Sequence, residues 1–238
     1  MQSITHEEQQ ERWEKEHQTP TVLLQMDSRH ASSGVKKFAT WMQDQGASFS
    51  DLKGLEVCCG KGRNVIWCAQ QGIAMTGLDF SQSAIAEAKK RAAEVDETDK
   101  ATFYVHDVTL QFPVDDSSLD FAFDCFGSTD IESLDARKKA RDNVVTALKQ
   151  GGYFMVYLLS TDDEFHKQMI AAHPGPDEGS FIHPTTGKYE KAFTEDEVKQ
   201  FYSDLTLVTL ERIPKVATFA DKQYNCNHIW AVFQKPIL

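Results

Sequence analysis

The chain has 238 residues and a formal net charge of −11 at pH 7, with 25 Lys and Arg against 36 Asp and Glu. An acidic chain without a dense Lys/Arg cluster is a poor candidate for binding the phosphate backbone of DNA or RNA. We expect no membrane span and no signal peptide, because no apolar run is long enough for either. Five cysteines without a C-x-x-C pair favour a reducing, cytoplasmic compartment.

The N-terminal part of the chain predicts a helical cap. The segment Glu7–His17 is charged and permits a helix. Apolar side chains recur at helical spacing over Val35–Met42, and Gly46 is a plausible residue to close that second helix. An apolar group lies between the two segments: Val22, Leu23, Leu24 and Met26. We expect residues 1–50 to lie against or over a main domain of residues 51–238.

The main domain alternates short apolar runs with segments of helical periodicity. The runs predict strands at Leu55–Cys59, Ala74–Asp79, Ala101–Val105, Leu119–Phe126 and Tyr153–Leu159. The intervening segments predict helices at Asn64–Gln71, Ala84–Val95 and Asp135–Gln150. This alternation indicates an α/β fold in which crossover helices join parallel strands. Near-continuous apolar runs suit strands that are covered on both faces.

The end of the chain predicts two further strands, at Leu205–Ile213 and His228–Phe233. About fourteen residues without helical periodicity join them, so we expect an antiparallel pair and not another crossover unit.

Residues 160–193 interrupt the alternation. A short helix is predicted at Phe165–Ala172, followed by a segment with the composition of a loop. The run Thr194–Glu197 is a capping box that opens a helix reaching Tyr202. A long loop in a compact domain is usually functional or disordered, so we expect this insertion on the substrate side.

A glycine loop follows the first predicted strand, in the segment Glu56-Val57-Cys58-Cys59-Gly60-Lys61-Gly62. Glycines at a strand-to-helix turn permit close backbone approach to a ligand. A dinucleotide fingerprint needs Gly or Ala three residues after the second glycine, where this chain has Val65. Asp79, seventeen residues after Gly62, ends the second strand, where a carboxylate can accept hydrogen bonds from ribose hydroxyls. The loop therefore indicates a nucleoside ligand more than a pyrophosphate.

These ordered motifs resemble the class I S-adenosylmethionine-dependent methyltransferase family, whose first motif runs acid-x-Gly-x-Gly-x-Gly. Cys58 replaces the first glycine, which is tolerable if this position does not need a positive φ. The resemblance implies a Rossmann-like, doubly wound seven-stranded sheet of order 3-2-1-4-5-7-6 with strand 7 antiparallel. Phe193–Glu197 and Tyr202 more loosely resemble the tellurite-resistance and thiol methyltransferase-like branch.

The resemblance also implies the cofactor, S-adenosylmethionine, and the residues that bind it. Asp79 corresponds to the family's ribose-binding acid and Asp107 to its adenine N6 acceptor. Cys125 and Phe126 correspond to residues near the transferable methyl group. The cofactor-binding set implied is Glu56, Cys58, Gly60, Gly62, Asp79, Phe80, Asp107, Val108, Asp124 and Cys125.

The insertion supplies the candidate catalytic groups. His166, His173 and His183 lie in or near its loop, and three solvated histidines are a simpler interpretation than a metal site. We expect no metal, because the cysteines lack paired ligand spacing. His183 is the candidate general base or substrate-orienting group, and Tyr189 is a comparable candidate.

The predicted function is methyl transfer from S-adenosylmethionine to a small-molecule acceptor by direct in-line displacement, under a lid formed by the N-terminal helices and the insertion. Three alternatives stay open: an NAD(P)-dependent oxidoreductase on a related sheet, a non-catalytic S-adenosylmethionine-binding module, and a methyltransferase that acts on protein. Val65 and the terminal strand pair argue against the oxidoreductase. The acceptor atom (oxygen, nitrogen, sulfur or a metalloid) and the oligomeric state stay open as well.

Overall fold

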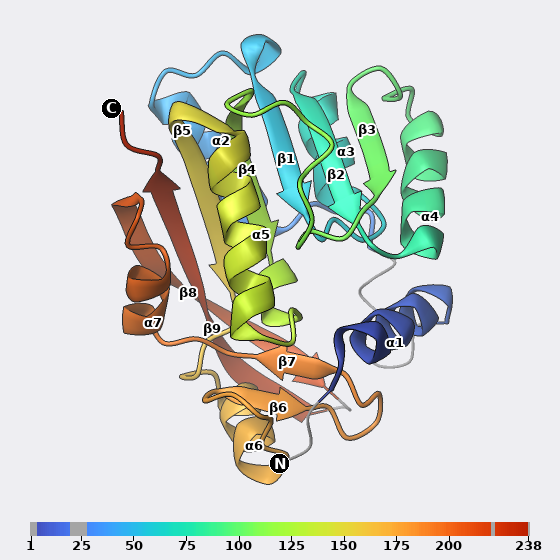
Figure 1. The fold of residues 1–238 in the computed structure, drawn as a ribbon, viewed down its shortest axis with the longest axis vertical. Coiled ribbons are helices and arrows are strands. Elements are labelled where there is room, and N and C mark those ends of the chain that lie inside the picture. Colours follow the sequence, from blue (N-terminus) through green and yellow to red (C-terminus); the bar gives the residue numbers. More distant parts are fainter. Residues whose placement is uncertain (1–3, 20–27, 220–221, 238) are drawn as a thin grey trace.

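The computed structural model of the chain describes residues 4–19, 28–219 and 222–237 (Figure 1). The apolar group of Val22 to Met26 lies outside these residues. The helices are α1 (His6–Gln18), α2 (Ser33–Asp44), α3 (Arg63–Gln70), α4 (Gln82–Ala93), α5 (Leu134–Ala147), α6 (Glu164–Ala172) and α7 (Glu195–Phe201), with 3-10 turns η2 (Phe49–Asp51) and η3 (Gly127–Thr129). The strands are β1 (Lys53–Val57), β2 (Ala74–Asp79), β3 (Ala101–Val105), β4 (Leu119–Cys125), β5 (Leu148–Leu158), β6 (Ser180–Ile182), β7 (Tyr189–Lys191), β8 (Thr206–Phe219) and β9 (Lys222–Gln234).

A seven-stranded sheet of order β3-β2-β1-β4-β5-β9-β8 forms the centre of the molecule. Strands β1 to β5 run parallel to one another, and β9 runs antiparallel to both β5 and β8. Since β8 and β9 are the sixth and seventh strands of this sheet in chain order, the predicted order 3-2-1-4-5-7-6 with a reversed last strand is confirmed. The bounds predicted for β2 and β3 are also those observed.

Both faces of the sheet are covered by helices, as the apolar strand runs predict (Figure 1). In β4, Phe121 and Phe123 pack into the cluster that contains residues of α2, α3 and α4. Ala122, between them, packs on the other face with residues of α5 and α7. This alternation along one strand is the period of two that a β-strand imposes on its side chains.

Some predicted bounds are wrong: β1 ends at Val57 and not at Cys59, and β5 begins at Leu148, inside the segment predicted as a helix up to Gln150.

Two larger parts of the fold also differ from the prediction. The terminal strands continue through most of the segment expected to join them, and their pairing runs from Thr206↔Gln234 to Phe219↔Lys222. Pro214 lies within β8 and is accommodated because β8 is the edge strand of the sheet. The insertion, expected as a loop after its helix, contains the hairpin β6–β7. Its three-residue strands are too short for periodicity to reveal.

No helix among residues 4–19, 28–219 and 222–237 is long and apolar enough to cross a membrane.

Substituting Gly62 should destabilise the fold more than the matched substitution at Gly46. Both residues have a left-handed backbone, with φ +76 and +86, so Ala costs about 1–2 kcal/mol of conformational strain at either. A Cβ on Gly62 would also lie 2.7 Å from the Phe103 ring and 2.9 Å from the Ala88 Cβ, whereas nothing lies within 4 Å at Gly46. Such crowding adds about 1–3 kcal/mol. Urea unfolding of G62A and G46A measures both costs, and equal values would contradict this packing argument.

Candidate cofactor site

The glycine loop joins β1 to α3 through three left-handed residues. Cys58 has φ 53, Gly60 has φ 53, and Gly62, the N-cap of α3, has φ 76. The position of Cys58 therefore needs the positive φ that would favour glycine, and the side chain costs about 1–2 kcal/mol there. Cys58 is nevertheless accommodated, with its Cβ against Gly127. The replacement of glycine by Cys58 was expected to be tolerable only at a negative φ. Since φ is positive, that condition is not met, and Cys58 is a strained residue of the loop.

Asp79 holds this loop at the end of β2. Its Oδ2 accepts a hydrogen bond from the backbone N–H of Gly60 at 2.8 Å, and its Oδ1 accepts one from Ser81 at 2.9 Å. Burial raises the pKa of this carboxyl above its ordinary value. A carboxylate has about four lone-pair sites, so both oxygens can still accept from ligand hydroxyls.

Glu56, within β1, is the other buried acid behind the loop. The side-chain amide of Asn64 donates to its Oε1 at 2.6 Å, and the Oδ1 of Asn64 accepts from the backbone N–H of Ser32 at 2.8 Å. Burial raises the pKa of Glu56 to about 8. Its Oε2 is buried without a hydrogen-bond partner. A buried acceptor without a partner is costly, and an ammonium group of a ligand would satisfy it.

Asp107 lies two residues beyond β3, the neighbour of β2. Its Oδ1 accepts the backbone N–H and the hydroxyl of Thr109, both at 2.8 Å, and its Oδ2 lies 2.7 Å from His6 Nε2. Burial opposes ionisation, but the bonds from Thr109 and His6 outweigh it and lower the pKa of Asp107. The backbone carbonyl of Val108 accepts from Asn143 at 3.0 Å.

A cavity of about 20 Å³ brings together four residues of the predicted cofactor set: Cys58, Phe80, Asp107 and Val108. Residues of α1 and of the segment 130–132 line its other side. A larger cavity of about 280 Å³, between Met42 and Tyr153, contains none of the predicted set. We therefore place the site by its chemistry, at the smaller cavity.

Asp124 and Cys125 end β4, next to β1. The carboxylate of Asp124 accepts the backbone N–H of Ser128 at 3.0 Å and also contacts the Ser128 hydroxyl. Burial raises the pKa of Asp124 to about 6. Asp124 thus holds the turn η3, and Cys125 is partly exposed beside it. Phe126 has φ 71 and lies 4.7 Å from the ring of Tyr157.

Helix α1 lies beside the carboxyl ends of β2 and β3 (Figure 1) and supplies residues that the sequence analysis did not select. His6 lies between Asp107 and Glu132, with its Nδ1 2.9 Å from Glu132 Oε1. Glu14 Oε2 accepts from the Ser81 hydroxyl at 2.6 Å. A Cβ added to Gly60 would lie 3.4 Å from His17 Cε1, so His17 covers the glycine loop. The sequence gives one indication of these contacts: α1 has few apolar side chains, so it can pack against the domain mainly through polar groups.

The insertion holds α1 from the other side. Gln9 pairs with the backbone of Tyr189, donating to its carbonyl at 2.9 Å and accepting from its N–H at 3.0 Å. The ammonium group of Lys188 lies 3.6 Å from the centre of the Trp13 ring, a cation–π contact. Helix α1 is therefore clamped between the end of the sheet and the hairpin β6–β7.

The two candidate catalytic residues lie in the insertion and have protein partners. His183 Nδ1 accepts the backbone N–H groups of Thr185 and Thr186 at 3.3 and 3.4 Å, and burial lowers its pKa. Tyr189 is fully buried, and its hydroxyl donates to Asp177 and accepts from Arg137, each at 2.8 Å. Burial raises the pKa of Tyr189. Their catalytic roles stay predictions.

Comparisons with known proteins bear on the domain and the fold of this chain. Residues 55–152, which span the glycine loop to strand β5, match a family model described as a methyltransferase domain. A S-adenosylmethionine-dependent methyltransferase from Methanosarcina mazei superposes with a TM-score of 0.70 at 22% identity, covering 83% of this chain and 98% of that one. Another, from Anabaena variabilis, gives 0.70 at 15% identity, covering 98% and 96%.

A third structure, the 1,6-didemethyltoxoflavin-N1-methyltransferase of Burkholderia thailandensis with bound 1,6-didemethyltoxoflavin and S-adenosylhomocysteine, gives a TM-score of 0.69 at 14% identity. It covers 100% of this chain and 93% of that one. At these identities the superpositions establish the fold. A search of curated proteins found no match.

Docking of α1 should weaken as the pH rises. Partial burial opposes charge on His6, but Asp107 and Glu132 together raise its pKa above the ordinary 6.5. The charged His6 therefore stabilises the docked helix fully at a pH below the pKa of an unfolded histidine. This stabilisation is lost as the pH rises through the higher pKa of His6 in the folded chain. Amide hydrogen exchange, corrected for its intrinsic pH dependence, should show lower protection of α1 at about pH 8.5 than at about pH 5.5. A His6→Gln variant that kept the same pH dependence would contradict the role of His6.

Proposed function

Residues 55–152 match a methyltransferase-domain model, and we propose that the chain is a class I S-adenosylmethionine-dependent enzyme that methylates a small-molecule acceptor by direct in-line displacement. The observation that carries the proposal is the set of acids around the glycine loop. Asp79 ends β2, Asp107 follows the adjacent β3, and Glu56 keeps a buried oxygen without a partner. Two acids at neighbouring strand ends suit a nucleoside, and the third suits its cationic amino acid end.

These residues fit S-adenosylmethionine. Asp79 would hold the ribose hydroxyls, Asp107 with Phe80 and Val108 would hold the adenine, and Glu56 would face the amino group. When bound, the cofactor supplies a methyl group on a sulfonium, which leaves readily as a thioether. The chain then has mainly to hold the acceptor in line and to exclude water. Gly60, Gly62 and Cys58 let the backbone approach the cofactor in left-handed conformations.

We propose that residues 1–50 form a cap and that α1, with the insertion 160–193, acts as the lid. A cavity of about 20 Å³ is too small for a nucleoside, so α1 has to shift for the cofactor to enter. His6 holds the Asp107 oxygen that an adenine amino group would need. The contacts of His6, Gln9 and Glu14 are all polar, and polar contacts can be exchanged for water at modest net cost.

The insertion 160–193 would contact the methyl acceptor and determine which acceptors bind. In the neutral His183 ring, an Nδ1 that accepts hydrogen bonds leaves the proton on Nε2. This tautomer suits the orientation of an acceptor oxygen better than abstraction of its proton. Tyr189 would position the lid through Arg137 and Asp177. A small acceptor in a reducing compartment also fits the acidic charge of the chain and its five free cysteines.

Asp79→Ala should weaken binding of S-adenosylhomocysteine about 100-fold. Each of two ribose hydroxyls loses a charged acceptor, and the loss is about 3 kcal/mol in total. Isothermal titration calorimetry measures it directly. Asp120→Asn, at the opposite end of the sheet where Asp120 pairs with Lys149, serves as the matched control and should bind normally. Unchanged affinity in Asp79→Ala, or equal binding of NAD(P)H by the natural chain, would refute the assigned site.

Label from radioactive S-adenosylmethionine should enter the low-mass fraction of a cell extract and not its protein or nucleic acid fractions. A site covered by α1 and the insertion admits a small acceptor more readily than a folded macromolecule. The Asp79→Ala variant provides the blank. Label that depends on Asp79 and stays with protein would instead assign a protein acceptor.

A further inference from the structure

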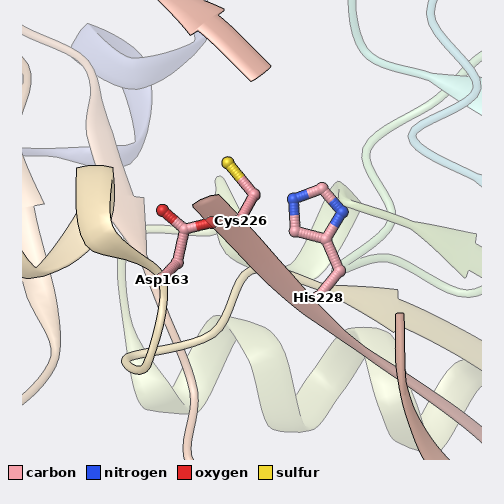
Figure 2. A group of neighbouring side chains, drawn as sticks. All are labelled: Asp163, Cys226 and His228. Atoms are coloured by element: carbon pink, nitrogen blue, oxygen red, sulfur yellow. The ribbon is translucent and has the colours of Figure 1, made fainter. Parts of the chain in front are cut away.

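Three side chains with metal-ligating atoms meet where β9 projects beyond the sheet. Strand β5 pairs with β9 only from Gln234 back to Ile229, so Lys222–His228 extend past it and pack near α6. Cys226 and His228 are two residues apart and share one face of β9. Asp163, the N-cap of α6, comes from the insertion to meet them (Figure 2).

The donor atoms of this group are close together and buried. One ligand atom from each of Asp163, Cys226 and His228 lies within 4.8 Å of the other two. The three residues are 0%, 3% and 7% exposed. Cys226 and Cys68 are both buried, but Cys68 packs inside an apolar core cluster and Cys226 lies beside polar side chains. A buried thiol between a carboxylate and an imidazole is not explained by apolar packing.

His228 is oriented from behind. Its Nδ1 lies 3.0 Å from the hydroxyl of Tyr157, so Nε2 is the nitrogen left for a ligand. Figure 2 shows one ring nitrogen of His228 directed toward Cys226 and Asp163. A ligating histidine usually has its second nitrogen held by such a partner, which fixes both tautomer and ring orientation.

The two carboxylate oxygens of Asp163 differ in their hydrogen-bond partners. Its Oδ1 accepts the backbone N–H groups of Phe165 at 2.9 Å and His166 at 3.1 Å, and lies 2.9 Å from the Nδ1 of His166. Its Oδ2 is buried, no N–H or O–H group of the described residues donates to it, and the Cys226 thiol is a neighbouring side chain that interacts with the carboxylate. A thiol is a weak donor, so this buried oxygen keeps a desolvation cost, which a bound cation would offset.

We propose that Asp163, Cys226 and His228 bind a zinc-like divalent transition-metal ion. Oxygen, sulfur and nitrogen donors suit Zn²⁺ and do not suit Mg²⁺ or Ca²⁺, which take oxygen ligands. In a tetrahedral zinc site the ligand atoms are roughly 3.3–3.8 Å apart, so small side-chain rotations close the cluster. On binding, the Cys226 thiol releases its proton to solvent as the metal–sulfur bond forms.

Three protein ligands leave a fourth position for water or a small solute. The ring of His228 lies 5.1 Å from that of Phe126, which follows β4. The metal would therefore lie near the acceptor end of the proposed methyltransferase site. Metal binding does not require the proposed function and is tested separately from it.

The test is titration of the reduced, chelator-treated full chain with Zn²⁺ by calorimetry and with Co²⁺ by absorbance. We expect one ion per chain and a thiolate-to-cobalt charge-transfer band. Cys226→Ser should abolish the band, and Cys226→Ser and His228→Gln should each weaken Zn²⁺ binding at least tenfold. Asp163→Asn keeps a residue that can cap α6 and should still weaken binding.

Two control variants test whether Zn²⁺ binding is specific to this cluster. Cys68→Ala removes a buried thiol from another part of the core and His173→Gln removes another insertion histidine, and both should bind as the natural chain does. Absence of stoichiometric Zn²⁺ binding, or binding unchanged in Cys226→Ser, overturns the proposal. If circular dichroism shows that Cys226→Ser does not fold, Asp163→Asn gives the same decision. S-adenosylhomocysteine affinity, measured alongside, separates this result from the proposed function.

Discussion

The hydrogen bond from the Gly60 backbone to Asp79 is the constraint on which the site depends. It joins the loop after β1 to the end of β2 at 2.8 Å, so the glycine loop keeps its left-handed residues in a fixed place. The same carboxylate is buried, and its pKa is raised for that reason. A group held in this way has its orientation determined before a ligand arrives. The carboxylate proposed to bind the cofactor ribose is thus the same group that fixes the geometry of the loop, in which Cys58 is strained.

Around this fixed point the rest of the site is made of exchangeable contacts. Helix α1 meets the sheet through His6 and Glu14, and meets the insertion through Gln9 and Trp13. The hydrogen bonds of His6, Gln9 and Glu14 have a small net free energy because water can replace them. The apolar interior of the sheet cannot be exchanged in the same way. The proposed site thus combines an apolar, closely packed sheet with a helix that docks mainly through polar contacts, one of them from a histidine.

The extension of β8 and β9 has a consequence beyond the sheet. It carries Cys226 and His228 to the N-terminus of α6, where Asp163 has a buried oxygen to which no N–H or O–H group in the described part of the chain donates. The expectation of no metal rested on the absence of paired ligand spacing in the sequence. Asp163 is far from Cys226 along the chain, so spacing could not indicate their proximity. The pairing of an edge hairpin, and not a motif, creates this cluster.

The sequence by itself determined the sheet and the positions of two acids, Asp79 and Asp107, at the ends of neighbouring strands. Apolar runs of strand length alternating with helical segments imply parallel strands, and Asp79 and Asp107 follow from their places at strand ends. Only the tertiary structure decided the positive φ at Cys58, the hairpin β6–β7, the docking of α1 and the partners of Tyr189. The physical reason is the separation along the chain of the residues that interact. Periodicity and strand-end position are local properties, whereas His6 reaches Asp107 and Asp163 reaches His228 only when distant segments fold together.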